Sequence, residues 1–202
     1  MDASPSAAFL TSSLCPTRTI STATRTYHTM VQTEKQIEEL GLTLPPAPGA
    51  KANYAPVQRS GNLLYLSGHL PVTADGTLIT GRLGPESGHK SVEHGYEAAK
   101  QVGLNLIATL KQELGDLDRV EQVVKLFGIV QSHEDFKEQH LVINGCSDLL
   151  VQVFGKERGM HARSAIGTNS LPLDVSQSAL LLITKWDAGI PIYSSNLSLS
   201  TL

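Results

Sequence analysis

One long amphipathic segment, Ser91–Leu114, constrains the fold more than any other feature of this sequence. Its apolar side chains recur every three or four residues, at Tyr96, Ala99, Val102, Leu106 and Leu110. This spacing places them on one face of an α-helix, and such a face is stable when it packs against another apolar surface. Gly115 follows at once and is the residue type that most often ends a helix. The segment therefore predicts a long helix that covers a core.

The segment after this helix, Val120–Val130, is rich in aliphatic and β-branched residues. Its length and composition indicate a buried strand inside a sheet. A second long helix is expected over Phe136–Phe154, with its cap in Ser132–Asp135. The remaining expected elements are a short helix at Glu34–Leu40, two strand pieces in Val57–Leu66 that turn at Ser60-Gly61-Asn62, and strands at Leu78–Thr80, Ser164–Thr168 and Ser178–Lys185.

This order of elements predicts an α+β fold, in which a mostly antiparallel sheet carries both long helices on one face. The opposite face then needs cover, because a strand as apolar as Val120–Val130 is not stable in contact with water. Self-association is the simplest cover, and we expect the chain to form an oligomer through this face.

Length and composition favour one domain, over residues 31–190. The chain has 202 residues, of which 41% are apolar and 17% charged, which suits a single core. A net charge of -3 and a pI near 6.1 do not favour binding to nucleic acid or to an anionic membrane surface. No apolar run reaches the roughly 20 residues of a membrane span. Cys15 and Cys146 lack the spacing of a metal site, so we expect no metal and no organic cofactor.

Residues 1–30 differ in composition from the rest of the chain. They are rich in Ser, Thr and Ala, contain Arg18 and Arg25, and have one acidic residue, Asp2. That composition is typical of a mitochondrial transit peptide, which would place the protein in the mitochondrial matrix. The alternative is a non-native extension, with translation starting at Met30 and the protein in the cytoplasm. Residues 191–202 are expected to form a flexible tail.

Three stretches of the expected domain resemble the Rid (YjgF, L-PSP) family. They are Gly61–Pro71, where a strand ends in Ser-Gly-His-Leu-Pro, then Asn144 early in the second helix, then Ala162–Ile166 followed by Leu171-Pro172. The opening, Ile37–Gln58, resembles a longer subgroup labelled endoribonuclease L-PSP or chorismate-mutase-like. These similarities follow one another in the family's order and cover the region from about Glu34 to Trp186.

The resemblance implies a chorismate-mutase-like α+β fold and a homotrimer packed through its sheets, with a cleft between each pair of subunits. In active members of the family, the substrate is a 2-imino or 2-enamino acid released by pyridoxal-phosphate enzymes. Water attacks the C=N carbon, ammonia leaves, and a 2-keto acid results. The implied partners are other copies of the chain and a small carboxylate or imino-acid metabolite.

The family's site residues correspond to Arg163, Ala165, Gly68, His69 and Asn144 of this sequence. Arg163 is expected to hold the substrate carboxylate, because a guanidinium offers a planar fork for two parallel hydrogen bonds. Its plain alternative is a structural ion pair. Ala165 stands where the family often has Cys, and its backbone groups are expected to hold the substrate nitrogen or the attacking water.

The other three residues are expected to line the cleft. Gly68 would let backbone approach the ligand closely, or simply end a strand. His69 is either an acid–base group or a polar lining residue. Asn144 is expected to donate or accept a hydrogen bond across the cleft, or to tie its helix to a loop.

Departures from the family pattern bear on catalysis. Active members carry a Glu in the last strand, thought to orient the water, and Ser178 stands at that position here. Pro56 also replaces a Tyr that the family usually has. Loss of one acid–base group typically lowers a rate about 100-fold or more. The sequence therefore leaves open whether the chain is an enzyme.

Two functions remain in view. One is a Rid-like hydrolytic deaminase, and the other is a non-catalytic trimer that binds small carboxylates or acts as an interaction module. Cleavage of RNA ranks last, because an acidic chain with 5% aromatic residues and no basic cluster offers little to hold RNA.

Overall fold

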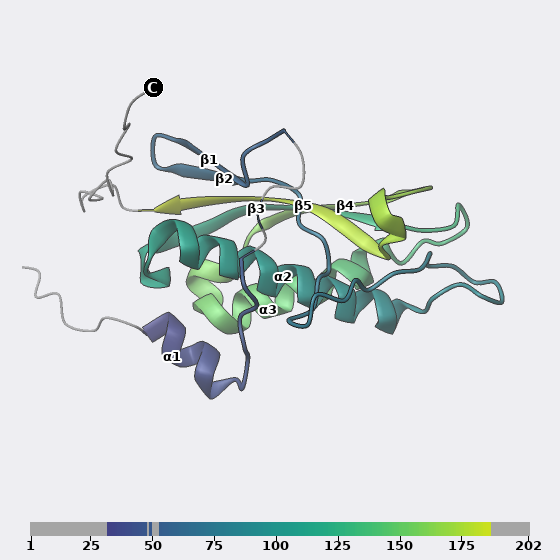
Figure 1. The fold of residues 1–202 in the computed structure, drawn as a ribbon, viewed down its shortest axis with the longest axis horizontal. Helices are drawn as coiled ribbons and strands as arrows, with labels where there is room; N and C mark the ends of the chain where they lie inside the picture. The colour runs from purple at the N-terminus through teal and green to yellow at the C-terminus, as the bar shows by residue number, and fades with distance from the viewer. Residues whose placement is uncertain (1–31, 48, 50–52, 187–202) are drawn as a thin grey trace, which may run out of the picture.

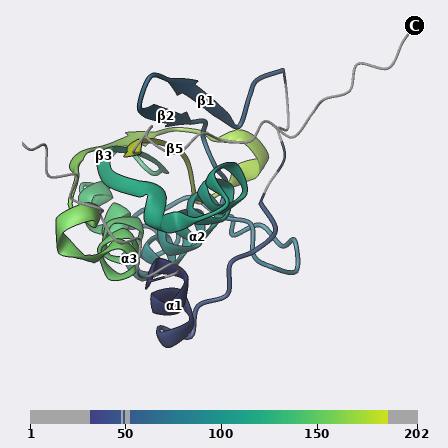
Figure 2. The same cartoon turned by 90° about the vertical axis from the view of Figure 1, so that its left-hand side faces the viewer.

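The computed structural model describes residues 32–47, 49 and 53–186, with the backbone alone for 177–186. A sheet and a pair of long helices form two layers, and both helices lie on the same face of the sheet (Figures 1 and 2). The expected α+β architecture is therefore confirmed. The expected transit peptide at 1–30 and tail at 191–202 lie outside the described residues. Within the described part, no helix combines the length and apolar character needed to cross a membrane.

The longer helix, α2 (Val92–Leu114), forms where the apolar periodicity predicts it. Its N-cap is Ser91, whose hydroxyl accepts a hydrogen bond from the backbone N–H of His94. The helix ends at Gly115, whose φ of 76° is left-handed and costs glycine no steric strain. The second helix, α3 (Gln139–Gly159), packs against α2, and side chains from both helices and from the sheet form one core.

The sheet has five strands in the order β1-β2-β5-β3-β4. Their bounds are β1 Val57–Ser60, β2 Leu63–Leu66, β3 Val120–Gln131, β4 Ala162–Thr168 and β5 Gln177–Trp186. Neighbouring strands are antiparallel, except for β3 and β4, which run parallel because α3 carries the chain back between them. The expected mostly antiparallel sheet is confirmed, and β4 lies at one of its edges.

A short helix, α1 (Gln32–Glu39), packs below the two long helices, as Figure 2 shows. Its first backbone N–H groups donate to the carboxylate of Asp118, at 2.8 Å from Gln32 and 3.1 Å from Thr33. A carboxylate at a helix N-terminus satisfies donors that have no partner within the helix. The same carboxylate also accepts a hydrogen bond from the Thr33 hydroxyl.

Two expectations about secondary structure are wrong. Leu78–Thr80 forms isolated bridges rather than a strand. The expected cap in Ser132–Asp135 does not begin α3, which starts at Gln139 without a side-chain cap. Residues 132 and 133 instead donate backbone hydrogen bonds to Thr168 at 3.0 Å and to Leu83 at 2.8 Å, which keeps this segment extended beyond β3.

The face of the sheet opposite the helices presents apolar side chains. Along β3, the buried residues Leu126 and Val130 alternate with the half-buried Phe127 and Ile129. Ile166 of β4 pairs with Ile129 and is 45% exposed in a single chain. Alternation along a strand places Phe127, Ile129 and Ile166 on the face away from the helices. Oligomerisation through this face stays a prediction.

Candidate functional site

Arg163 is the second residue of β4, and it pairs with Leu126 of β3. Because Leu126 is a core residue under the helices, this register directs Arg163 to the same side. The side chain is half-buried there, at the edge of the sheet and beside α3. The strand and the helix therefore hold this guanidinium in place, and it stays partly exposed.

Two residues of α3 accept hydrogen bonds from this guanidinium. Nη1 of Arg163 donates to Oδ1 of Asn144 at 2.8 Å and to Oγ of Ser147 at 3.2 Å. Asn144 and Ser147 are three residues apart, so they lie one turn apart on the same face of the helix. Asn144 therefore binds Arg163 of its own chain, and a hydrogen bond from Asn144 across a cleft between subunits stays a prediction.

No carboxylate neutralises Arg163 within the described residues: no Asp or Glu side chain there lies within 4.0 Å of its nitrogens. Both of its partners are neutral acceptors. The structural ion pair that was the plain alternative for Arg163 is therefore not present in this part of the chain. A half-buried cation without a counter-ion is a site that favours an anion.

His161 extends the hydrogen bonds around Arg163. Its Nε2 lies 3.1 Å from the Ser147 hydroxyl, and its Nδ1 lies 2.6 Å from the carbonyl oxygen of Gly159. Burial, together with the nearby charge of Arg163, lowers the pKa of His161 despite the opposing bond to Gly159. The sequence analysis missed Ser147 and His161, although the spacing of Asn144 and Ser147 on one helix face was a signal for the former.

Cys146 lies next to these residues in sequence but offers no reactive thiol. It is fully buried in the core, and burial raises its pKa to about 12, although the charge of Arg163 acts in the opposite direction. A thiol that stays protonated is a poor nucleophile. Ala165, in turn, pairs with Gly128 and packs half-buried against the core, so only its backbone is suited to contact a ligand.

Gly68 and His69 do not lie beside Arg163 within one chain. They follow β2, which is separated from β4 by β5 and β3. Three spacings of about 4.8 Å put roughly 14 Å between those two strands. If all the expected residues form one site, Gly68 and His69 must come from a neighbouring subunit.

His69 is buried, with 4% of its surface exposed. Its Nδ1 lies 2.7 Å from the Ser67 carbonyl oxygen, and its Nε2 lies 2.8 Å from the Thr109 hydroxyl of α2. Burial lowers the pKa of His69, with the Ser67 bond opposing. Both ring nitrogens of His69 therefore have partners in the core of its own chain, and a role for His69 in a cleft between subunits stays a prediction.

Ser178, which replaces the family's Glu, pairs with Ile129 near the start of β5. Ile129 pairs in turn with Ile166, so the backbone of Ser178 lies across β3 from Ile166, which is three residues along β4 from Arg163. The effect of this replacement on catalysis stays a prediction.

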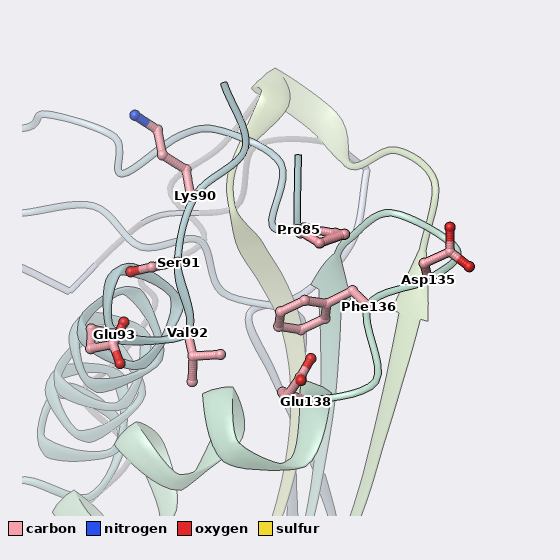
Figure 3. A pocket seen from close by; sticks show the side chains of 9 residues that line it. Pro85, Lys90, Ser91, Val92, Glu93, Asp135, Phe136 and Glu138 are labelled. Carbon is pink, nitrogen blue, oxygen red and sulfur yellow. The ribbon is translucent and has the colours of Figure 1, made fainter. Parts of the chain in front are cut away.

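An open cavity of about 330 Å³ lies elsewhere, where both long helices begin (Figure 3). Its charged lining residues are Lys90, Glu93, Asp135 and Glu138, and Phe136 contributes an apolar ring. Three carboxylates against one ammonium disfavour a carboxylate ligand. The cavity does not include Arg163 and is not the expected site.

Two groups of side chains among the described residues have the donor atoms of a metal site. They are His133, Glu134 and Asp135, and Glu34, Asp116 and Asp118. The second group already binds α1 and α2, through Asp118 to Thr33 and Glu34 to Lys111. The first lies on the surface, with Asp135 73% exposed, and neither group contains an expected site residue.

Comparison with known proteins gives consistent matches over the sheet and both long helices. The model of the family described as "YjgF/chorismate mutase-like, putative endoribonuclease" matches residues 34–184. The protein TCP17 of Trypanosoma cruzi is 43% identical over 136 residues, which cover 67% of this chain and 83% of TCP17. The mitochondrial protein MMF1 of Saccharomyces cerevisiae is 27% identical over 131 residues, which cover 64% of this chain and 72% of MMF1.

A solved structure agrees with these matches. The protein Atu1372 of Agrobacterium tumefaciens superposes with a TM-score of 0.69 at 43% sequence identity. The superposition covers 77% of this chain and 92% of Atu1372.

Proposed function

Because this chain belongs to the YjgF/chorismate mutase-like family, we propose that it is a hydrolytic deaminase of 2-imino or 2-enamino acids. Water adds to the C=N carbon, ammonia leaves, and a 2-keto acid is released. Arg163 binds the substrate carboxylate and so holds the imine carbon in one place. The observation that carries the proposal is a half-buried guanidinium with two neutral partners and, within the described residues, no counter-ion.

The hydrogen bonds of Arg163 suit this role. A guanidinium has five N–H donors, and the two bonds to α3 both use Nη1. The edge formed by Nε and Nη2 has no partner among the described residues. Two parallel N–H donors match the two oxygens of a carboxylate. The substrate would therefore supply the negative charge that the described part of the chain does not place at this position.

The complete site is proposed to form in a homotrimer. Gly68 and His69 lie about 14 Å from the Arg163 strand in one chain, by the strand spacing. Packing of the exposed sheet faces is proposed to bring the β2 end of one subunit to the β4 edge of the next, where the Arg163 side chain lies beside α3. The backbone at Gly68 then approaches the ligand. The buried His69 ring stabilises the chain at this point through its hydrogen bonds with Ser67 and Thr109.

The mitochondrial matrix is the proposed location. Residues 1–30 have the composition of a transit peptide, and the relative MMF1 is described as mitochondrial.

A non-catalytic carboxylate-binding trimer is the second candidate, and Ser178 favours it. A hydroxyl replaces the family's Glu in the last strand, and within the described residues no carboxylate lies within 4.0 Å of Arg163 to assist water. Binding needs only the guanidinium, whereas turnover also needs help with proton transfer.

The test is deaminase turnover of an imino acid generated in place by an amino-acid oxidase. Wild type is compared with Arg163→Ala and Arg163→Lys, and with Arg59→Ala as a control that removes a surface ion pair to Glu113. Loss of two charge-assisted hydrogen bonds is expected to lower kcat/KM by about 100-fold or more in Arg163→Ala. Arg163→Lys keeps the charge without the fork, and we expect an intermediate value.

The two candidates give different results. Acceleration that disappears in Arg163→Ala and survives in Arg59→Ala supports the deaminase. No acceleration by a folded wild-type trimer, combined with binding of a 2-keto acid that depends on Arg163, replaces the deaminase with the binding protein.

A further inference from the structure

The hydrogen bonds around Arg163 have a fixed direction. The Gly159 carbonyl oxygen can only accept, so Nδ1 of His161 carries the proton and donates to it at 2.6 Å. Nε2 of a neutral His161 then has a free lone pair, which accepts from the Ser147 hydroxyl at 3.1 Å. With its proton directed at His161, the Ser147 oxygen presents its lone pairs to Nη1 of Arg163 at 3.2 Å.

We propose that Ser147 and His161 are positioning residues that orient Arg163, so that its Nε and Nη2 donors face an incoming carboxylate side-on. This inference rests on the proposed function of Arg163 as the carboxylate-binding residue. Asn144 holds one proton of Nη1 and Ser147 the other, which fixes the plane of the guanidinium. His161 acts through Ser147, because the chain of bonds reaches Arg163 only through that hydroxyl.

The charges around this network support the orientation. The Cys146 thiol keeps its proton, since burial raises its pKa to about 12. Burial lowers the pKa of His161, and the charge of Arg163 adds to that effect. Cys146 and His161 are therefore both neutral near pH 7, and Arg163 carries the only charge among the residues of this network. A neutral network orients the guanidinium without competing for the anion.

Two substitutions of His161 separate its two hydrogen bonds. The amide nitrogen of Asn occupies the place of Nδ1, so His161→Asn keeps the bond to Gly159 and loses the bond to Ser147. The longer Gln carries its terminal amide at the place of Nε2, so His161→Gln offers an acceptor to Ser147. If His161 positions Arg163 through Ser147, the His161→Gln protein should behave as wild type and the His161→Asn protein should not. If His161 serves only as a structural tether to Gly159, the reverse is expected.

The experiment uses the full chain with ¹⁵N-labelled arginine side chains. The signals of Arg163 are assigned by their loss in Arg163→Ala, and rotation about its Nε–Cζ bond is measured by NMR. Pyruvate, a stable 2-keto acid, is titrated in parallel as the carboxylate probe. We expect slow rotation in wild type and His161→Gln, and fast rotation in Ser147→Ala and His161→Asn. The Kd for pyruvate should rise about 10-fold in the latter two, which corresponds to one hydrogen bond.

Slow rotation in Ser147→Ala, or a His161→Asn protein that matches wild type while His161→Gln does not, overturns the inference. Ser147→Ala is a small change at a half-buried position, so it keeps the test decisive if a His161 variant folds poorly. Failure of wild type to bind pyruvate, with rotation still released in Ser147→Ala, leaves the positioning role supported and removes the proposed function instead.

Discussion

At the scale of single residues, surroundings decide what two polar side chains can do. Arg163 lies at a sheet edge, and its hydrogen-bond partners among the described residues are neutral, which suits the proposed binding of a carboxylate. His69 lies in the core, where Ser67 and Thr109 occupy both ring nitrogens. The sequence placed both residues in one cleft by resemblance. Burial separates their roles, because a ring that is enclosed on all sides has no route to a substrate of its own subunit.

We expect His69 to make the protein less stable at acid pH. Burial lowers its pKa below the ordinary 6.5, so the unfolded chain takes up a proton more readily than the folded chain. The free energy of unfolding that the neutral His69 contributes is fully present above pH 6.5. It falls as the pH drops below that value, by at most about 1.4 kcal/mol per pH unit for one group.

Urea unfolding at pH 7.5 and pH 5 measures this effect. His69→Gln should show a smaller loss between the two pH values than wild type, and the exposed His140→Gln should behave as wild type. His161, whose pKa is lowered in the same direction, leaves some pH dependence in every protein. An unchanged pH dependence in His69→Gln would contradict the expectation.

At the scale of elements, the close packing of α2 and α3 depends on Gly145. A Cβ atom at this position would lie 2.0 Å from the backbone oxygen of Tyr96 and 3.1 Å from the Cβ of Ala99. Because backbone cannot move aside as a side chain does, only glycine fits here. This contact holds the helix that carries Asn144 and Ser147 at its distance from α2.

Gly145→Ala is therefore expected to destabilise the protein, by about 1–3 kcal/mol or more. The matched control is Gly103→Ala on the facing helix, where the nearest atom is the flexible Leu149 side chain at 2.8 Å. Alanine also favours the helix by about 1 kcal/mol, which offsets part of that milder clash. In thermal unfolding, wild type and Gly103→Ala should have a higher Tm than Gly145→Ala. An equal decrease in Tm in both variants would rule out the backbone contact as the cause.

Sequence patterns located the helices and strands well, and for a physical reason. The period of α2 and the composition of β3 are local properties, set by which faces must be buried. The sequence pattern predicted a start for α3 that is too early. The backbone N–H groups of Ser132 and His133 donate to the carbonyl oxygens of Thr168 and Leu83, which are distant in sequence. Such long-range hydrogen bonds compete with local capping, and a local sequence pattern does not predict them.

At the scale of the whole molecule, the apolar sheet face opposite the helices is the surface through which we expect the chain to assemble. By strand alternation, Phe127, Ile129 and Ile166 lie on the side of the sheet opposite the buried Leu126 and Val130. Contact with water at this face is unfavourable, so another copy of the chain is the expected cover.

A charge on this face should prevent assembly without unfolding the chain. We expect wild type to have about three times the 21.7 kDa mass of one chain by light scattering, and Ile166→Glu to be a monomer with unchanged circular dichroism. Leu141→Glu, on the outer surface of α3 and equally exposed at 41%, should remain a trimer. A trimeric Ile166→Glu protein would show that the subunits pack through a different surface.

By itself, the sequence determined the α+β class, the mostly antiparallel sheet and the helices on one face, and its resemblance to the Rid family singled out Arg163 as the candidate carboxylate-binding residue. The fold class follows from periodicity and composition, which are local properties of the chain, whereas the interest in Arg163 follows from the family's motifs. Only the tertiary structure decided that Asn144 and Ser147 hold Arg163, that His161 joins them, and that His69 lies in the core. These contacts join residues from separate elements, and their geometry exists only once β4 has paired with β3 and α3 has packed across them.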